Sequence, residues 1–154
     1  MGTAEHRVLI DTNVLIYATL EEDPRFERSR KLLLSPGGDE RYVSVQNLAE
    51  MYPNLTGPRM QPPDAPAVAR AKILSIASLP TLQVLPLTGD VQAIALELCE
   101  KYGITRQRYF DVQLVATMVA YGIGTLLTEN DRDFQDLAEI RAVNPFTSSS
   151  RAPR

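Results

Sequence analysis

The stretch Arg-Val-Leu-Ile-Asp-Thr-Asn-Val-Leu-Ile-Tyr-Ala at residues 7–18 indicates the fold. Residues 8–10 form a short, unbroken apolar run, which is typical of a strand buried on both faces of a parallel sheet. Asp11 ends this run, and Thr12 and Asn13 are favourable residues for a helix start before the apolar pattern resumes. Because open α/β sheets bind ligands at the carboxyl ends of their strands, Asp11 is a candidate site residue. An aspartate between a strand and a helix is also common as a cap.

The length and composition of the chain limit how many domains it can form and indicate where in the cell it acts. A chain of 154 residues fits one domain, and we expect a single domain at residues 1–146 followed by a disordered tail at residues 147–154. No apolar run approaches the roughly 20 residues that span a bilayer, and no signal-peptide core follows Met1. The sequence therefore predicts a soluble cytoplasmic protein that does not enter a membrane.

The side chains present argue against several kinds of catalysis. Cys99 is the single cysteine, and its apolar neighbours in a helical pattern indicate a small core residue. His6 is the single histidine and lies in a polar N-terminal segment. We therefore expect no catalytic histidine, no Cys-His pair and no zinc site of His and Cys. The formal net charge of −3 argues against binding nucleic acid through bulk electrostatics, but it leaves room for a local basic strip.

Strands and helices alternate along most of the chain. Apolar runs predict strands at residues 8–10, 42–43, 82–85, 125–128 and 141–143. The stretches between them predict helices that begin near residues 12, 24, 45, 67, 90 and 111. This alternation is typical of an α/β fold in which helices cover both faces of a parallel sheet.

The third predicted helix and the segment after it contain unusual residues. Ser44 is the expected N-cap, although Asn47 stands where Glu or Gln would complete a capping box. Pro53 removes a backbone donor inside the helix, so we expect a kink or break near Tyr52. Residues 57–66 include four prolines and are interpreted as a loop or a mobile lid.

Acidic residues occur at four places where a cleft at the end of the sheet could use them. They are Asp11 after the first strand, Glu50 in the third helix, Asp111 at a helix start, and Asp131 or Asp133 after the fourth strand. Structural alternatives exist, because Asp111 can cap its helix, Asp133 can stabilise a first turn and Glu50 can face solvent. Carboxylates that converge repel one another, so a cluster needs a cation among them. Mg²⁺ or Mn²⁺ held by carboxylates and water is the usual arrangement for work on phosphodiesters.

Four segments of the chain carry a resemblance to a known family. They are Asp11-Thr12-Asn13, Leu48-Ala49-Glu50-Met51-Tyr52, Asp111 at the start of an apolar helix, and Leu127-Thr128-Glu129-Asn130 with Asp133-Phe134. In this order and spacing they resemble the PIN-domain family, and more closely the toxin ribonucleases of VapBC toxin–antitoxin systems. The resemblance covers about residues 7–145, which is nearly the whole chain.

This resemblance implies a three-layer α/β sandwich with a central, mostly parallel sheet and helices on both faces. It also implies an endoribonuclease that depends on Mg²⁺ or Mn²⁺, forms a homodimer and is inhibited by a small VapB-like antitoxin encoded beside it. Asp11, Glu50 and Asp111 match the three core acids of the family. Thr128 matches the hydroxyl that commonly accompanies them.

Two positions depart from the family pattern. Asn130 stands where many members have an aspartate two residues after the threonine. Asn130 through its carbonyl, Asp131 and Asp133 are therefore alternative candidates for the fourth position. Pro53 lies where many relatives continue the helix, which leaves the direction of Glu50 open.

An acidic cleft that cleaves RNA needs positive charge at its rim. Arg106 and Arg108 precede Asp111 and are the first candidates to contact phosphate, with Arg59 in the proline-rich segment as a weaker one. Tyr109 is a candidate to stack on a base. The alternative is a solvated loop that does not contact RNA.

Other protein classes also place an aspartate at the end of the first strand. A phosphate-accepting receiver domain needs a lysine after a late strand, and residues 125–130 contain none. A haloacid-type phosphatase needs a second aspartate two residues after the first, where this chain has Asn13. We therefore predict a metal-dependent ribonuclease toxin. The alternative that stays open is a catalytically impaired PIN-like module that binds RNA or protein, because Asn130 replaces an acid.

Overall fold

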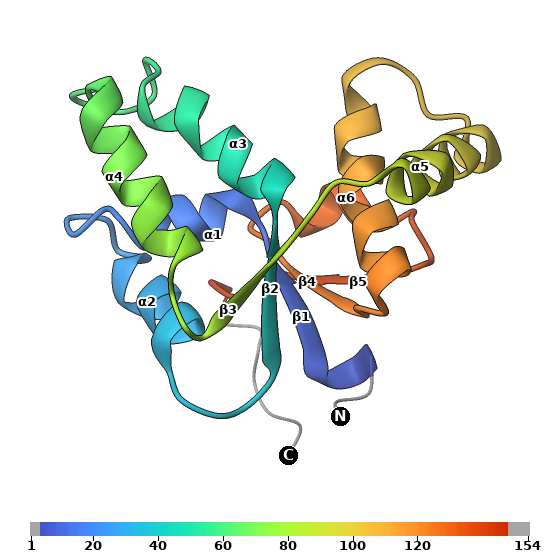
Figure 1. Cartoon of the computed structure of the whole chain (residues 1–154), viewed down its shortest axis with the longest axis horizontal. Helices are drawn as coiled ribbons and strands as arrows, with labels where there is room; N and C mark the ends of the chain where they lie inside the picture. Colours follow the sequence, from blue (N-terminus) through green and yellow to red (C-terminus); the bar gives the residue numbers. More distant parts are fainter. Residues whose placement is uncertain (1–3, 148–154) are drawn as a thin grey trace.

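The computed structural model describes residues 4–147, and its central feature is a parallel sheet (Figure 1). The strands are β1 (Arg7–Ile10), β2 (Glu40–Ser44), β3 (Leu82–Leu85), β4 (Thr125–Leu127) and β5 (Arg141–Val143). They lie in the order β3-β2-β1-β4-β5, and each neighbouring pair is parallel. The expected disordered tail at residues 147–154 lies outside the described residues except for Thr147.

Strand β1 occupies the centre of the sheet because its side chains are apolar on both faces. Val8 is 6% exposed, and Leu9 and Ile10 are fully buried. Leu9 belongs to the core that includes Val115, whereas Ile10 belongs to a second core that includes Met51. Successive residues of a strand point to opposite faces, so β1 contributes to both cores.

Helices cover both faces of the sheet (Figure 1). One face carries α1 (Thr12–Tyr17), α2 (Phe26–Leu34), α3 (Val45–Leu55) and α4 (Pro66–Ala77). The other face carries α5 (Gly89–Tyr102) and α6 (Tyr109–Tyr121). Short 3₁₀ helices are η1 (Ala4–His6), η2 (Arg106–Arg108) and η3 (Asp131–Phe134). The predicted three-layer α/β sandwich is confirmed, and its sheet is wholly parallel.

Helix α3 corrects two expectations from the sequence. It continues through Pro53 to Leu55 without a break. Ala49, whose carbonyl loses the donor that proline lacks, lies on the exposed side of the helix. The capping box is also complete, because the side-chain oxygen of Asn47 accepts from the Ser44 amide at 2.9 Å. Asparagine therefore reaches the N-cap amide as Glu or Gln would.

Helix α6 begins two residues earlier than the sequence indicates. The 3₁₀ helix η2 leads directly into it at Tyr109, so Asp111 lies in the first turn and is not the N-cap. Gly122 ends the helix in the left-handed conformation, with φ of 67°. Within residues 4–147, none of the helices has the length and apolar character needed to cross a membrane.

Candidate active site

A cleft of about 240 Å³ lies at the carboxyl edge of the sheet and is lined by residues of α3 and α6. Four carboxylates line it, namely Asp11, Glu50, Asp111 and Asp133. They come from four places in the fold: the end of β1, the middle of α3, the first turn of α6, and η3. Figure 1 shows how the parallel strands bring these distant elements to one edge. The topology thus gathers acids that lie far apart in the sequence, two of them after strands and two of them in helices.

Asp11 is the most deeply held of the four acids, with 8% of its surface exposed. One carboxylate oxygen caps α1 by accepting from the Thr12 amide at 2.8 Å, and the other accepts from the Thr128 hydroxyl at 2.7 Å. Burial raises the pKa of Asp11, while the bonds from Thr128 and Thr12 oppose that rise. Asp11 is therefore both the N-cap of α1 and a residue of the cleft, because capping leaves its carboxylate at the cleft.

The Thr128 hydroxyl links Asp11 to the loop after β4. Besides donating to Asp11, it accepts from the Asn130 amide at 3.1 Å and from the Asn13 side chain at 3.3 Å. Asn13 in turn accepts from the Glu129 amide at 3.2 Å. The sequence indicated Asn13 as a helix-start residue and as part of a family motif, and the structure shows that its side chain links α1 to this loop.

Glu50 points into the cleft despite Pro53 three residues later. Its carboxylate accepts from the Thr12 hydroxyl at 3.1 Å and from the Gln46 amide group at 2.9 Å. The solvent-facing alternative for Glu50 is therefore wrong, because the side chain is half-buried and bonded to α1.

Two polar residues of α3 were missed by sequence reasoning. Asn47 is fully buried and donates to Asp11 at 3.4 Å. Gln46 is 6% exposed and donates to Glu50. The available signal was two amides, each about one turn before the acid, on a helix whose other inward residues are apolar.

The pKa of Asp111 shows the influence of neighbouring charges most clearly. Its pKa is raised to about 6, first by burial and then by the negative charges of Asp133 and Asp11, with Arg108 acting in the opposite direction. A carboxyl whose pKa is raised by burial and by other carboxyls indicates a partly buried site in which negative charge outweighs positive charge.

The fourth acid facing the cleft is Asp133. Asp131, another candidate for the fourth position, lines only a neighbouring cavity, which Asp133 also borders. Asn130 lines both cavities and is exposed. The 3₁₀ turn of η3 explains the difference, since side chains two residues apart point in different directions in it.

The donor set of the cleft fits a hard divalent cation. Carboxylate oxygens with a nearby amide oxygen are the ligands that Mg²⁺ and Mn²⁺ take. Across residues 4–147, no three acidic, histidine or cysteine side chains stand as a preformed metal site.

The basic and aromatic candidates lie in different surroundings. Arg59 lines the acid cleft and is exposed. Arg106 is exposed in a left-handed conformation with φ of 59°. Arg108 is already paired with Asp136. The Tyr109 hydroxyl accepts from Gln92 and donates to Gln113, so its ring is held outside the lining of the cleft.

An ion-paired cluster anchors the far side of the loop after β4. Arg25 pairs with Glu129 and with Asp23. Its guanidinium carbon lies 3.8 Å from the centre of the Tyr17 ring, whose hydroxyl bonds to Glu129. This cluster fixes Glu129 beside the two loop residues, Thr128 and Asn130, that reach the site.

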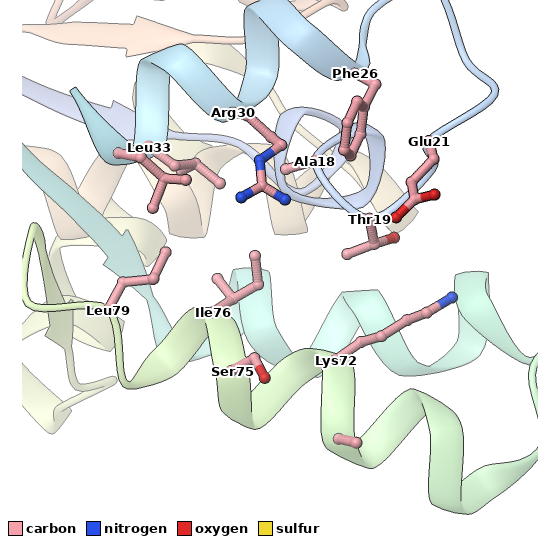
Figure 2. A pocket seen from close by; sticks show the side chains of 12 residues that line it. Ala18, Thr19, Glu21, Phe26, Arg30, Leu33, Lys72, Ser75, Ile76 and Leu79 are labelled. Carbon is pink, nitrogen blue, oxygen red and sulfur yellow. The ribbon is translucent and has the colours of Figure 1, made fainter.

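A second cavity, of about 410 Å³, lies between α2 and α4 (Figure 2). Phe26 and Leu33 face Ile76 across it, and Arg30 points into the space between them (Figure 2). Glu21 is its single carboxylate. This cavity is a groove with an apolar floor, and the acid cluster lies elsewhere.

Comparisons with known proteins were consistent with one another. The model of the PIN domain family matches residues 8–140. Ribonuclease VapC24 of Mycobacterium tuberculosis is 27% identical over 144 residues, which cover 90% of this chain and 97% of that protein.

Solved structures of toxins and toxin–antitoxin complexes share the fold. VapC20 of Mycobacterium tuberculosis, described as a sarcin–ricin loop cleaving toxin, has a TM-score of 0.64 at 19% identity, covering 87% of this chain and 98% of that one. VapBC2 of Rickettsia felis has a TM-score of 0.63 at 18% identity, covering 89% and 97%. FitAcB of Neisseria gonorrhoeae has a TM-score of 0.63 at 24% identity, covering 90% and 97%. Identities this low show a shared fold alone.

Replacing Asp111 by Asn tests whether burial and the neighbouring carboxylates raise the pKa of Asp111 in the cleft. Because the folded-state pKa of Asp111 is about 6 and its ordinary value is 3.8, the folded chain retains a proton that the unfolded chain loses between these values. Stability from this group is therefore lost as pH rises through that window. In excess chelator, we expect the unfolding free energy of Asp111→Asn relative to wild type to increase from pH 3.8 to about 6 and then to level off.

Asp136→Asn is the matched control for this urea-denaturation series. The hydrogen bond from Arg108 lowers the pKa of Asp136, so above its ordinary value of 3.8 this carboxyl is ionised in both states. Its variant should therefore show a constant difference from wild type over the same pH range. A flat profile for Asp111→Asn as well would contradict a raised pKa of Asp111 in the cleft.

Proposed function

The chain belongs to the PIN domain family, and we propose that it is a divalent-metal-dependent endoribonuclease that hydrolyses RNA phosphodiester bonds. The observation that carries this proposal is the convergence of four carboxylates in one cleft, with Asp11 buried and held by uncharged donors. Oxygen donors of this kind suit Mg²⁺ or Mn²⁺. The similarity to a protein named as a ribonuclease adds support.

Asp11, Glu50 and Asp111 would hold the cation. When bound, the cation lowers the pKa of a water molecule and stabilises the charge that develops on the phosphate. Thr128 fixes the orientation of Asp11, and Thr12 bridges the cleft to Glu50, so both acids are positioned before RNA arrives. Positioned acids of this kind reduce the reorganisation that catalysis would otherwise require.

The fourth position would be filled by Asp133 or by the Asn130 carbonyl, both of which line the cleft. Asp131 would take this role only if its side chain turned from the neighbouring cavity into the cleft. The alternative function, a catalytically impaired module that binds RNA or protein, has the Asn130 substitution in its favour. Asp133 weakens that alternative, because it supplies a fourth carboxylate from the same loop.

RNA would reach the acids through positive charge at the rim. Arg59 is the leading candidate, since it lines the cleft and has no ion-pair partner among residues 4–147. Arg106 is exposed and equally unpaired, whereas Arg108 would have to leave Asp136 to bind phosphate. Tyr109 would stack on a base only if its ring left the side chains that now hold it.

We further propose that the protein is the toxin of a toxin–antitoxin pair and acts in the cytoplasm as a homodimer. Similar folds occur in complexes of toxins with antitoxins, which supports a small VapB-like partner. The groove between α2 and α4 adjoins a cavity lined by the proline-rich segment, because Lys72, which is labelled in Figure 2, lines both. A partner segment laid from this groove towards the acid cleft would block access of RNA.

Purified protein should cleave single-stranded RNA with Mg²⁺ or Mn²⁺ and should lose that activity in excess chelator. Asp11→Asn keeps the shape of the side chain but removes a metal ligand, so the cleavage rate should fall by more than about 100-fold. Glu97→Gln removes an equal charge from an exposed position of α5 and should leave the rate unchanged. Undiminished cleavage by Asp11→Asn, or in chelator, would exclude the proposed chemistry.

Arg59→Ala should weaken RNA binding and lower the slope of log affinity against log salt by about 0.7, the contribution of one phosphate contact to a single strand. Arg108→Ala removes a guanidinium that is already paired with Asp136, so it should change the salt slope less. Fluorescence anisotropy over a salt series measures both. Equal slopes for Arg59→Ala and wild type would remove Arg59 from the RNA interface.

Expression in bacteria tests the toxin assignment. The chain alone should arrest growth, co-expression of the small reading frame beside its gene should relieve the arrest, and Asp11→Asn should abolish it. Arrest that persists with Asp11→Asn would favour a binding module that acts without hydrolysis. Absence of arrest by the wild-type chain would leave a nuclease without a toxin role.

A further inference from the structure

Phe110 is an exposed aromatic ring at the wall of the acid cleft. It lines the same cavity as the four carboxylates, and 48% of its surface is exposed. The other apolar side chains of the cavity are less available: Leu114 and Phe134 are each 3% exposed, and Ile16 is half-buried. Phe110 therefore presents the cleft's one widely open apolar surface within residues 4–147.

The backbone and the neighbouring ring hold Phe110 in place. It lies in the first turn of α6, directly before Asp111. Its carbonyl accepts from the Gln46 side chain at 2.8 Å, and Gln46 also donates to Glu50. Its ring meets Tyr109 edge-to-face with centroids 5.5 Å apart. The site's own hydrogen bonds thus fix the distance between this ring and the acids.

We propose that Phe110 is a stacking platform for an unpaired nucleobase next to the phosphate that is cleaved. This inference rests on the proposed ribonuclease function and deepens it, because it assigns to one residue of the same site the contact that would favour an unpaired base. Every base has a flat face that stacks on an aromatic ring, so the platform selects unpaired RNA without selecting base identity.

The surroundings favour a base over an apolar protein segment as the occupant. An apolar helix needs several adjoining apolar side chains, whereas the exposed neighbours of Phe110 in the cavity are charged or polar, including Arg59 and Asn130. A nucleotide combines a flat apolar face with a charged phosphate. Phe110, the acids and Arg59 provide for both parts within one cavity.

The test uses full-length protein that carries Asp11→Asn, so that bound RNA is not cleaved in Mg²⁺. The probes are short single-stranded RNAs with one 2-aminopurine at successive positions, and the same strands annealed to their complements. Phe110→Ala removes the ring, Phe110→Leu keeps apolar volume without a flat face, and Phe110→Tyr keeps the ring. Leu96→Ala, at an exposed position of α5, is the control.

Phe110→Ala and Phe110→Leu should bind single strands roughly 5- to 150-fold more weakly and should lose the quenching of 2-aminopurine at one position. Phe110→Tyr and Leu96→Ala should bind as the parent does, and affinity for the duplexes should not change. Full affinity of Phe110→Leu would overturn the inference, because apolar volume alone would suffice. It would also be overturned if Phe110→Ala weakened binding only by dissociating a dimer, as sedimentation would show.

These outcomes are separate from the test of the proposed function. Cleavage of RNA by the protein with its native Asp11 in Mg²⁺ decides whether the chain is a ribonuclease. If that protein cleaves and the Phe110 series binds alike, the stacking platform alone is wrong.

Discussion

Four carboxylates converge at the carboxyl edge of the sheet, and their mutual repulsion sets the conditions that the rest of the site has to meet. Asp11 follows the central strand and is buried there because β1 is apolar on both faces. Glu50, Asp111 and Asp133 reach the same cavity from α3, α6 and η3 at the carboxyl edge of the parallel sheet. Burial and like charge together raise the pKa of Asp111 to about 6. The cleft therefore holds like charges close together at an electrostatic cost. A bound cation, or a polyanion accompanied by its cations, would lower that cost.

The acids of the cleft and the acids at its border have different hydrogen-bond and ion-pair partners. Inside the cleft, Asp11 and Glu50 accept hydrogen bonds from uncharged hydroxyls and amides. At the border, Glu129 pairs with Arg25, and Asp136 pairs with Arg108. Uncharged donors orient a carboxylate without cancelling its charge, whereas arginines neutralise it. This contrast is what a cation site requires, because the ligands must be held in place and still remain negative.

The sequence predicts most of the fold because the strands are continuous apolar runs and their order in the chain follows parallel α/β logic. β3 and β5 have the predicted limits, and helices lie on both faces as expected. The unbroken α3 and its Asn47 cap could not be inferred, since they depend on which side of the helix faces solvent. The choice of Asp133 over Asp131 and the ion pair of Arg108 depend on a 3₁₀ turn and on contacts between distant segments. The exposed ring of Phe110 likewise becomes visible only when the cavity is formed.

Direct binding of Mn²⁺, followed by electron paramagnetic resonance at neutral pH, tests the central claim that the cleft acids form one cation site. We predict that the wild-type chain binds Mn²⁺, that Asp11→Asn and Asp111→Asn each weaken binding by at least about tenfold, and that Asp136→Asn leaves it unchanged. Mn²⁺ affinity that is equal in the wild type, Asp11→Asn and Asp111→Asn would contradict this claim.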